Sequence, residues 1–137
     1  MSFELFIECF AETRRSGISR DAVRSLFPID EEESQPDLWR VHYDTENSSL
    51  ILVTPLETDA GKLQSICVER PCGDIRLWES LLAILRMGSV VIYWPAGPPA
   101  IADERLAATL PQDLIDAIGE SITVHSAEEL LRAVQET

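Results

Sequence analysis

The stretch Arg70–Pro95 (RPCGDIRLWESLLAILRMGSVVIYWP) constrains the fold more than any other part of this chain. Asp74 can accept hydrogen bonds from the free amides that begin a helix, and its charge suits the helix dipole. Apolar residues then recur at helical spacing as far as Leu85, and Gly88 follows as a helix stop. Val90–Trp94 is a continuous run of β-branched and aromatic residues, which is typical of an interior strand. This order predicts a packed α/β core but indicates no particular reaction.

Four stretches in the N-terminal half are typical of β-strands. The first, Phe3–Phe10, carries apolar side chains on both faces, which predicts a strand that is covered on both sides. A turn is expected after it at TRRSG, and Ser19 is expected to cap a short helix that ends before Pro28. The other three stretches, separated by the turn sequences DTENS and ETDAGK, are Leu38–Tyr43, Leu50–Val53 and Leu63–Glu69. They predict an antiparallel meander.

The C-terminal part predicts two short helices between residues 103 and 119, and then a short strand at Ile122–His125. Ser126 and Glu129 have the spacing of a capping box, which begins the last helix. We expect Ile122–His125 to pair in parallel with Val90–Trp94 through a right-handed crossover.

The chain has 137 residues, a usual size for one domain. We therefore predict a single α/β domain, of mixed α+β type, over residues 1–137. Its core is expected to be a mixed sheet with an antiparallel meander, packed by a central helix at Asp74–Met87 and by a C-terminal helix.

Charge is the strongest indication of function. Acidic residues outnumber lysine and arginine by 24 to 11, which gives a formal net charge of -13. A field of this sign repels phosphate backbones and anionic lipid heads, so we expect no nucleic-acid partner and no membrane surface. A basic protein would be attracted. Acidic surfaces also serve solubility alone, and this is the more common case.

Cellular location follows from two further observations. No apolar run approaches the roughly 18 residues that cross a bilayer, and MSFELFIECF carries acids where a signal peptide has basic residues. The three cysteines, Cys9, Cys67 and Cys72, cannot all pair within one chain, which fits a reducing compartment. We therefore expect a cytoplasmic protein.

No sequence motif indicates a metal or a cofactor, and we expect neither. Cys67 and Cys72 lack the spacing of a zinc knuckle, and His42 and His125 lie far from them in the sequence. The chain has no GxGxxG, no P-loop and no HExxH. An enzyme would therefore need another kind of site.

Cys72 is the candidate nucleophile, because it precedes a helix start, where amide dipoles lower the pKa of a thiol. Arg70 and Arg76 are close enough in the sequence to add to that effect. A catalytic cysteine also needs a base, and the spacing brings neither His42 nor His125 to it. The structural alternative is a small residue that shapes the turn before the helix, and we favour it.

One concentration of basic residues surrounds the predicted turn and the next helix start. It consists of Arg14, Arg15, Arg20 and Arg24. An anion could bind there. The alternative, which we favour, is that these arginines pair with acids of the same molecule.

The acidic loop, residues 29–37 (IDEEESQPD), is the candidate contact surface for a basic partner. Acids around an aromatic residue resemble the hot spots of protein interfaces. The candidate contact residues are Glu31, Glu32, Glu33, Asp37 and the adjacent Trp39. The alternative is a flexible, solvated loop.

Several segments resemble a family of small, uncharacterised bacterial α/β proteins. They are RPCGD at Arg70–Asp74, LW at Leu77–Trp78, LRMG at Leu85–Gly88, VVIYWPAGPP at Val90–Pro99, GISRDAVRSLFP at Gly17–Pro28 and WRVHYD at Trp39–Asp44. The resemblance implies a bacterial cytoplasmic protein and assigns no activity or site residue. In size, acidity and α/β pattern the chain is also similar to bacterial toxin-immunity proteins, although no motif carries this likeness.

We therefore expect a non-enzymatic protein-binding module, in the most concrete form an immunity-type inhibitor of a basic partner protein. Two alternatives remain open. One is a small cysteine-dependent enzyme that uses Cys72. The other is a homodimeric accessory protein, with Val90–Trp94 as an open edge that pairs with a second copy.

Overall fold

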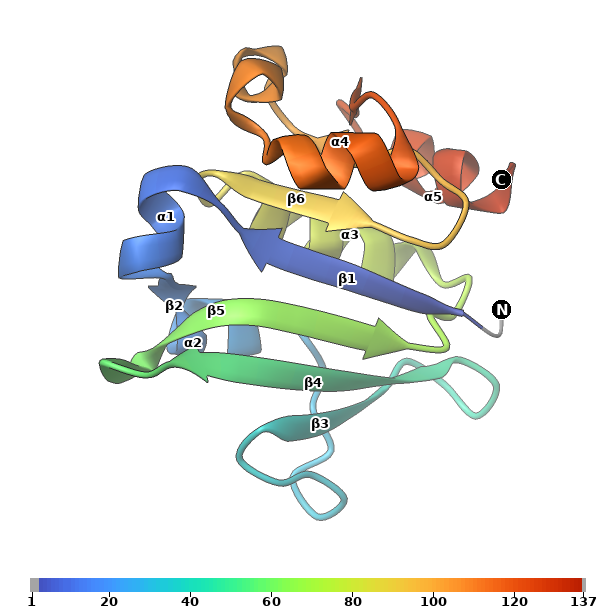
Figure 1. The fold of residues 1–137 in the computed structure, drawn as a ribbon. Coiled ribbons are helices and arrows are strands. Elements are labelled where there is room, and N and C mark those ends of the chain that lie inside the picture. Colours follow the sequence, from blue (N-terminus) through green and yellow to red (C-terminus); the bar gives the residue numbers. More distant parts are fainter. Residues whose placement is uncertain (1–2, 137) are drawn as a thin grey trace.

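One mixed sheet organises the computed structural model, which describes residues 3–136 (Figure 1). Its strands are β1 (Glu4–Cys9), β2 (Ile18–Ser19), β3 (Leu38–His42), β4 (Ser48–Leu56), β5 (Asp59–Glu69), β6 (Val90–Tyr93), β7 (Ala100–Ile101) and β8 (Ile122–Thr123). The helices are α1 (Ala11–Ser16), α2 (Arg20–Arg24), α3 (Ile75–Leu85), the 3-10 helix η1 (Glu104–Thr109), α4 (Gln112–Ile118) and α5 (Ala127–Gln135). The strand order is β3-β4-β5-β1-β6-β7-β8, and β2 pairs with β5.

The predicted α/β fold class and its meander are confirmed. β3, β4 and β5 are consecutive antiparallel neighbours, and antiparallel pairing continues through β1 to β6 and β7. Only β7 and β8 pair in parallel among the strands of residues 3–136. As predicted, a central helix, α3, and a C-terminal helix, α5, pack the core: α3 contacts the sheet, and α5 packs against α3.

The predicted parallel pairing of Val90–Trp94 with Ile122–His125 is wrong. β7 lies between β6 and β8, antiparallel to the first and parallel to the second. β7 has only two residues, and it follows a proline-containing loop, so no periodicity indicated it. Because β1 and β7 flank β6, Val90–Trp94 is not an open edge, and the prediction that two copies pair through this edge loses its basis. A homodimer as such stays a prediction.

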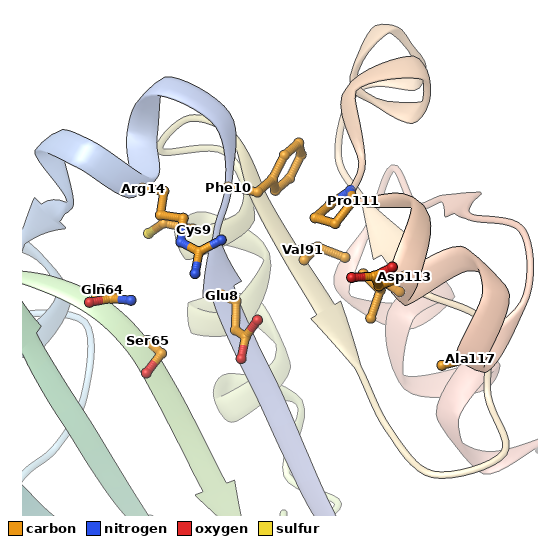
Figure 2. A pocket seen from close by; sticks show the side chains of 11 residues that line it. Glu8, Cys9, Phe10, Arg14, Gln64, Ser65, Val91, Pro111, Asp113 and Ala117 are labelled. Atoms are coloured by element: carbon orange, nitrogen blue, oxygen red, sulfur yellow. The ribbon is translucent and has the colours of Figure 1, made fainter.

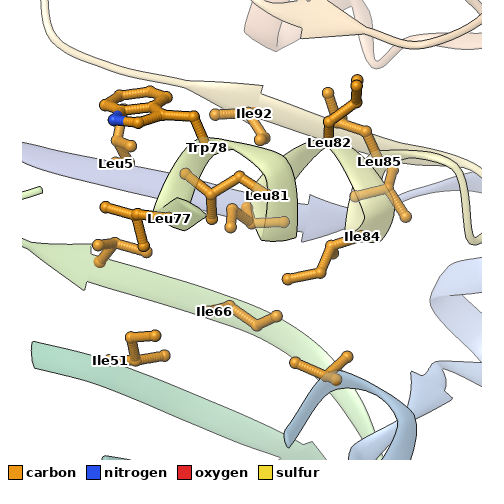
Figure 3. Close-up of a cluster of buried hydrophobic side chains, with 14 of the residues drawn as sticks. Leu5, Ile51, Ile66, Leu77, Trp78, Leu81, Leu82, Ile84, Leu85 and Ile92 are labelled. Atoms are coloured by element: carbon orange, nitrogen blue, oxygen red, sulfur yellow. The ribbon is translucent and has the colours of Figure 1, made fainter. Parts of the chain in front are cut away.

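The main core lies between the sheet and α3. Figure 3 shows the apolar side chains of α3 packed against Leu5, Ile51, Ile66 and Ile92 of four strands. As predicted, the Asp74 carboxylate caps this helix by accepting a hydrogen bond from the Arg76 amide (2.9 Å). One face of β1, β4, β5 and β6 is therefore well covered by α3.

The opposite face is covered only at one end. A smaller cluster of Phe10, Val91, Ile101 and Leu110 lies there, and Leu114 of α4 packs against it. In Figure 1, α4 stands in front of β6, whereas α3 lies behind the sheet. The described part of the chain thus places no helix over the front of β1, β5 and β4.

Three local predictions need correction. Phe3–Phe10 is not covered on both sides, because Glu4 and Glu8 are exposed on the second face. The segment predicted as a turn at TRRSG belongs largely to α1. In the expected capping box, Ser126 Oγ accepts from the Glu129 amide, but the Glu129 carboxylate accepts from the His125 amide.

Candidate functional site

The acidic loop is paired with arginines of the same molecule. Arg24 and Glu31 lie 2.7 Å apart, and Arg20 lies 3.0 Å from Asp37. The prediction that these two arginines pair with acids of the same chain is thus confirmed. A basic partner would have to compete with these intramolecular pairs.

Trp39 cannot serve as an exposed hot spot, because its side chain is 1% exposed and belongs to the core. Its indole Nε1 donates a hydrogen bond to the Pro36 carbonyl (3.1 Å). The guanidinium carbons of Arg20 and Arg24 each lie 5.9 Å from the centre of the ring. The predicted contact surface therefore reduces to its acids, Glu31, Glu32, Glu33 and Asp37, whose role in binding stays a prediction.

Glu33, His42 and Asp30 form the group that comes nearest to a metal-ligand set among residues 3–136. His42 Nε2 lies 3.3 Å from Glu33 Oε2 and 3.7 Å from Asp30 Oδ2. The same Glu33 oxygen also lies 3.3 Å from Arg40 Nε. Since a guanidinium already neutralises this oxygen, an ion-pair network accounts for the arrangement.

Cys72 lies in a structural position. Its amide donates to Ser49 Oγ (3.0 Å) and its carbonyl accepts from Trp78 Nε1 (2.9 Å), so the backbone here fixes the start of α3. Arg76, which was expected to help activate the thiol, pairs with Asp74 at 2.7 Å. Within residues 3–136, neither histidine makes a hydrogen bond to Cys72.

The other two cysteines, Cys9 and Cys67, are poor nucleophiles at neutral pH. Burial raises the pKa of Cys9 to about 11, and the nearby Glu8 adds to the shift. Partial burial raises the pKa of Cys67 to about 11 as well, and Glu4 adds to it through its charge and a hydrogen bond. Both groups are therefore protonated thiols near pH 7.

A row of apolar side chains crosses the uncovered part of the sheet. Cross-strand pairs join the row in the order Leu38, Leu52, Cys67, Phe6 and Tyr93. Each of these side chains is partly exposed. The Phe6 and Tyr93 rings stack with their centres 5.3 Å apart. We call this row and the acids beside it the open face.

Three glutamates border the row. Glu4 and Glu69 are directly opposite each other on β1 and β5, and Glu8 lies on the other side of Phe6. Tyr93 donates its hydroxyl to Glu8 (2.9 Å), and the Cys67 thiol donates to Glu4 (3.6 Å). Across residues 3–136, no lysine or arginine forms an ion pair with any of these three glutamates.

A cavity of about 390 Å³ adjoins the open face where α4 rises from the sheet. Figure 2 shows Glu8 and Ser65 on the sheet side, Asp113 and Ala117 on α4, and Arg14 at the end near α1. The cavity therefore lies between a sheet floor and a helical wall.

The open face was missed at the sequence level because it depends on register. Alternation along β1 puts Phe6 on the opposite face from Leu5 and Ile7, between the exposed Glu4 and Glu8, but it does not show which strands lie beside Phe6. The other members of the row come from strands that are distant in sequence, such as Leu52 and Cys67.

Comparisons with known proteins gave no match among protein-family models, curated proteins or solved structures. The resemblance to small bacterial α/β proteins and to toxin-immunity proteins therefore stays a prediction. No helix in the described part of the chain has the length and apolar character needed to cross a membrane.

Proposed function

We propose that this chain is a non-enzymatic protein-binding module, an immunity-type inhibitor that uses the open face to bind a basic protein in the cytoplasm. The observation that carries the proposal is the pair Glu4 and Glu69, opposed on neighbouring strands beside an exposed apolar row. The three cysteines are free thiols, which fits a reducing compartment.

The acidic pair favours a cationic partner for a physical reason. Like charges directly opposite on two strands destabilise a sheet. A lysine or arginine placed between Glu4 and Glu69 would relieve that repulsion. Binding would therefore be favoured because it removes a destabilising interaction of the free protein. The net charge of -13 would also speed the encounter with a basic protein.

A second copy of this chain is a poorer occupant of the open face. Two copies that met face to face would bring Glu4, Glu8 and Glu69 of each close to the same acids of the other. The formal charge of -13 on each copy opposes the approach. The apolar row therefore fits a partner of opposite charge better.

Photo-crosslinking tests this proposal. A photoreactive phenylalanine analogue replaces Phe6 in cells that produce the protein, and the same analogue at the exposed Glu128 on α5 is the matched control. We expect a basic protein to crosslink from position 6 and not from position 128. Absence of a position-6 crosslink, or crosslinks to the same chain only, would contradict the proposal.

Binding of the purified crosslinked protein then separates the two acidic surfaces. We expect Glu69→Lys to weaken its affinity at least tenfold, whereas Glu57→Lys in the exposed β4–β5 turn changes it less than threefold. A larger effect of Glu33→Lys than of Glu69→Lys would return the contact to the acidic loop. Equal effects of Glu69→Lys and Glu57→Lys would leave only a general charge attraction.

A further inference from the structure

We infer that the partner places a basic amphipathic α-helix on the open face, beside α4 and above β1 and β5, with its N-terminus near Glu4 and Glu69. This inference rests on the proposed function, and it names the element, position and direction of the partner.

The position follows from packing distances. Neighbouring helices pack at about 8–10 Å, which is roughly two strand spacings of about 4.8 Å. α4 packs on the β6 end of this face, over Val91. The next helix position therefore lies above β1 and β5, where no helix of residues 3–136 is found.

The cavity fits this arrangement. Its floor includes Glu8 and Ser65, and its wall includes Asp113, Leu114 and Ala117 of α4. Because α4 projects from the sheet, a second flat sheet cannot lie across this region. A single helix can contact the floor and the wall together, as in helix-in-groove recognition.

Charge sets the direction. The acidic pair Glu4 and Glu69 lies at the start of β1, and Arg14 lies beyond its end, lining the cavity. Arg14 forms no ion pair within residues 3–136. A helix is electropositive at its N-terminus and electronegative at its C-terminus, so it would run from the acidic pair towards Arg14.

This direction also suits α4. Figure 1 shows α4 running opposite to β1, so the bound helix would be antiparallel to α4. The six residues of β1 extend about 20 Å, which corresponds to about 13 residues of α-helix. Apolar residues at helical spacing would cover Phe6 and Cys67, and flanking lysines or arginines would reach Glu8 and Asp113.

The first test uses a synthetic peptide as the probe. It carries leucines at positions i, i+3, i+4 and i+7, and lysines elsewhere, and the control has the same composition in strict alternation. We expect the helical-period peptide to bind at least tenfold more tightly, with NMR shift changes at Phe6, Glu8, Ser65 and Ala117. Equal affinity, or shift changes confined to the acidic loop, would overturn the inference.

A matched pair of substitutions tests the wall. Ala117 and Ala108 are both exposed, but only Ala117 lines the cavity. We expect Ala117→Trp to lower the affinity for both the helical-period peptide and the crosslinked partner at least fivefold. Ala108→Trp should change either affinity less than twofold. If Glu69→Lys lowers the affinity for the partner and Ala117→Trp does not, the open face binds the partner, but the inferred position of a helix beside α4 is wrong. If neither substitution has an effect, the proposed function fails as well.

A spin label on the peptide tests the direction. A label at its N-terminus is expected to broaden the NMR signals of Glu4 and Glu69, and a label at its C-terminus those of Arg14. The reversed pattern would overturn the assigned direction.

Discussion

Gly97 lies so close to Trp94 that a Cβ atom at this position would overlap the indole ring. Trp94 is 2% exposed, so the ring has no free space into which it can move. We expect Gly97→Ala to lower the free energy of unfolding by about 1–3 kcal/mol, because overpacking forces neighbours from their minima. Urea denaturation measures the change.

Gly73 provides the control, since no atom of residues 3–136 lies within 4 Å of a Cβ placed there. Gly73→Ala is expected to change the free energy of unfolding by less than about 0.5 kcal/mol. Equal losses in the two variants would show that the Trp94 contact is not the cause.

Cys67 gives a prediction about pH. Its pKa is raised to about 11, first by burial and then by Glu4, so the reactive thiolate is scarce near pH 7. Removing the negative charge in Glu4→Gln lowers this pKa, and alkylation of Cys67 by iodoacetamide at pH 8 should become faster. Mass spectrometry of the alkylated peptides gives the rate, and Cys72 in the same samples is the internal control. A slower or unchanged rate at Cys67 would contradict the assigned role of Glu4.

Trp39 illustrates what the sequence could predict about single residues. Alternation along Leu38–Tyr43 puts Trp39 and Val41 on one face of a strand, and both are buried. The error was to read neighbouring acids as a sign of exposure. The sequence positions of these acids do not show that Arg20 and Arg24 form ion pairs with the loop and lie against the Trp39 ring.

At the scale of elements, the β1–β5 pair carries a testable cost. Glu69→Gln removes one of two like charges that face each other, and we expect it to raise the free energy of unfolding by about 0.2–1 kcal/mol. The gain should shrink in high salt, because partly exposed charges are screened. Urea denaturation at low and high NaCl measures both effects.

Glu57→Gln is the matched control for Glu69→Gln, because it removes the same charge from an exposed turn. A similar gain from Glu57→Gln would mean that net charge, and not the opposed pair, causes the stabilisation. In the proposed function, Glu69→Gln would also weaken partner binding, so stability and affinity should move in opposite directions.

Elements with strong local patterns were predictable, and weakly patterned ones were not. Alternation and turn residues indicated β3, β4 and β5, and a capping residue with helical spacing indicated α3. β7 has only two residues, and its pairing depends on the loop that returns it to β6. The open face likewise depends on the register that aligns Leu52, Cys67 and Phe6, which no single segment encodes.

At the scale of the whole molecule, charge repulsion works against the folded state. With a formal net charge of -13, compaction brings many carboxylates closer together than they are in the unfolded chain. We expect the urea midpoint of unfolding to rise as NaCl increases from about 20 mM to about 500 mM, because the Debye length shortens. A falling midpoint would mean that intramolecular ion pairs, such as Arg24 with Glu31, outweigh the repulsion.

The position of β1 within the sheet affects how the chain can fold during synthesis. Both neighbours of β1 come much later in the sequence: Glu4 pairs with Glu69 of β5, and Cys9 pairs with Val90 of β6. β1 therefore leaves the ribosome before either of them. Its apolar residues, Leu5 and Ile7, must therefore remain unburied while most of the chain is translated. The central strand of the sheet cannot pair on both sides until β6 has been synthesised. The nascent chain is therefore exposed to aggregation and to chaperone binding until that point.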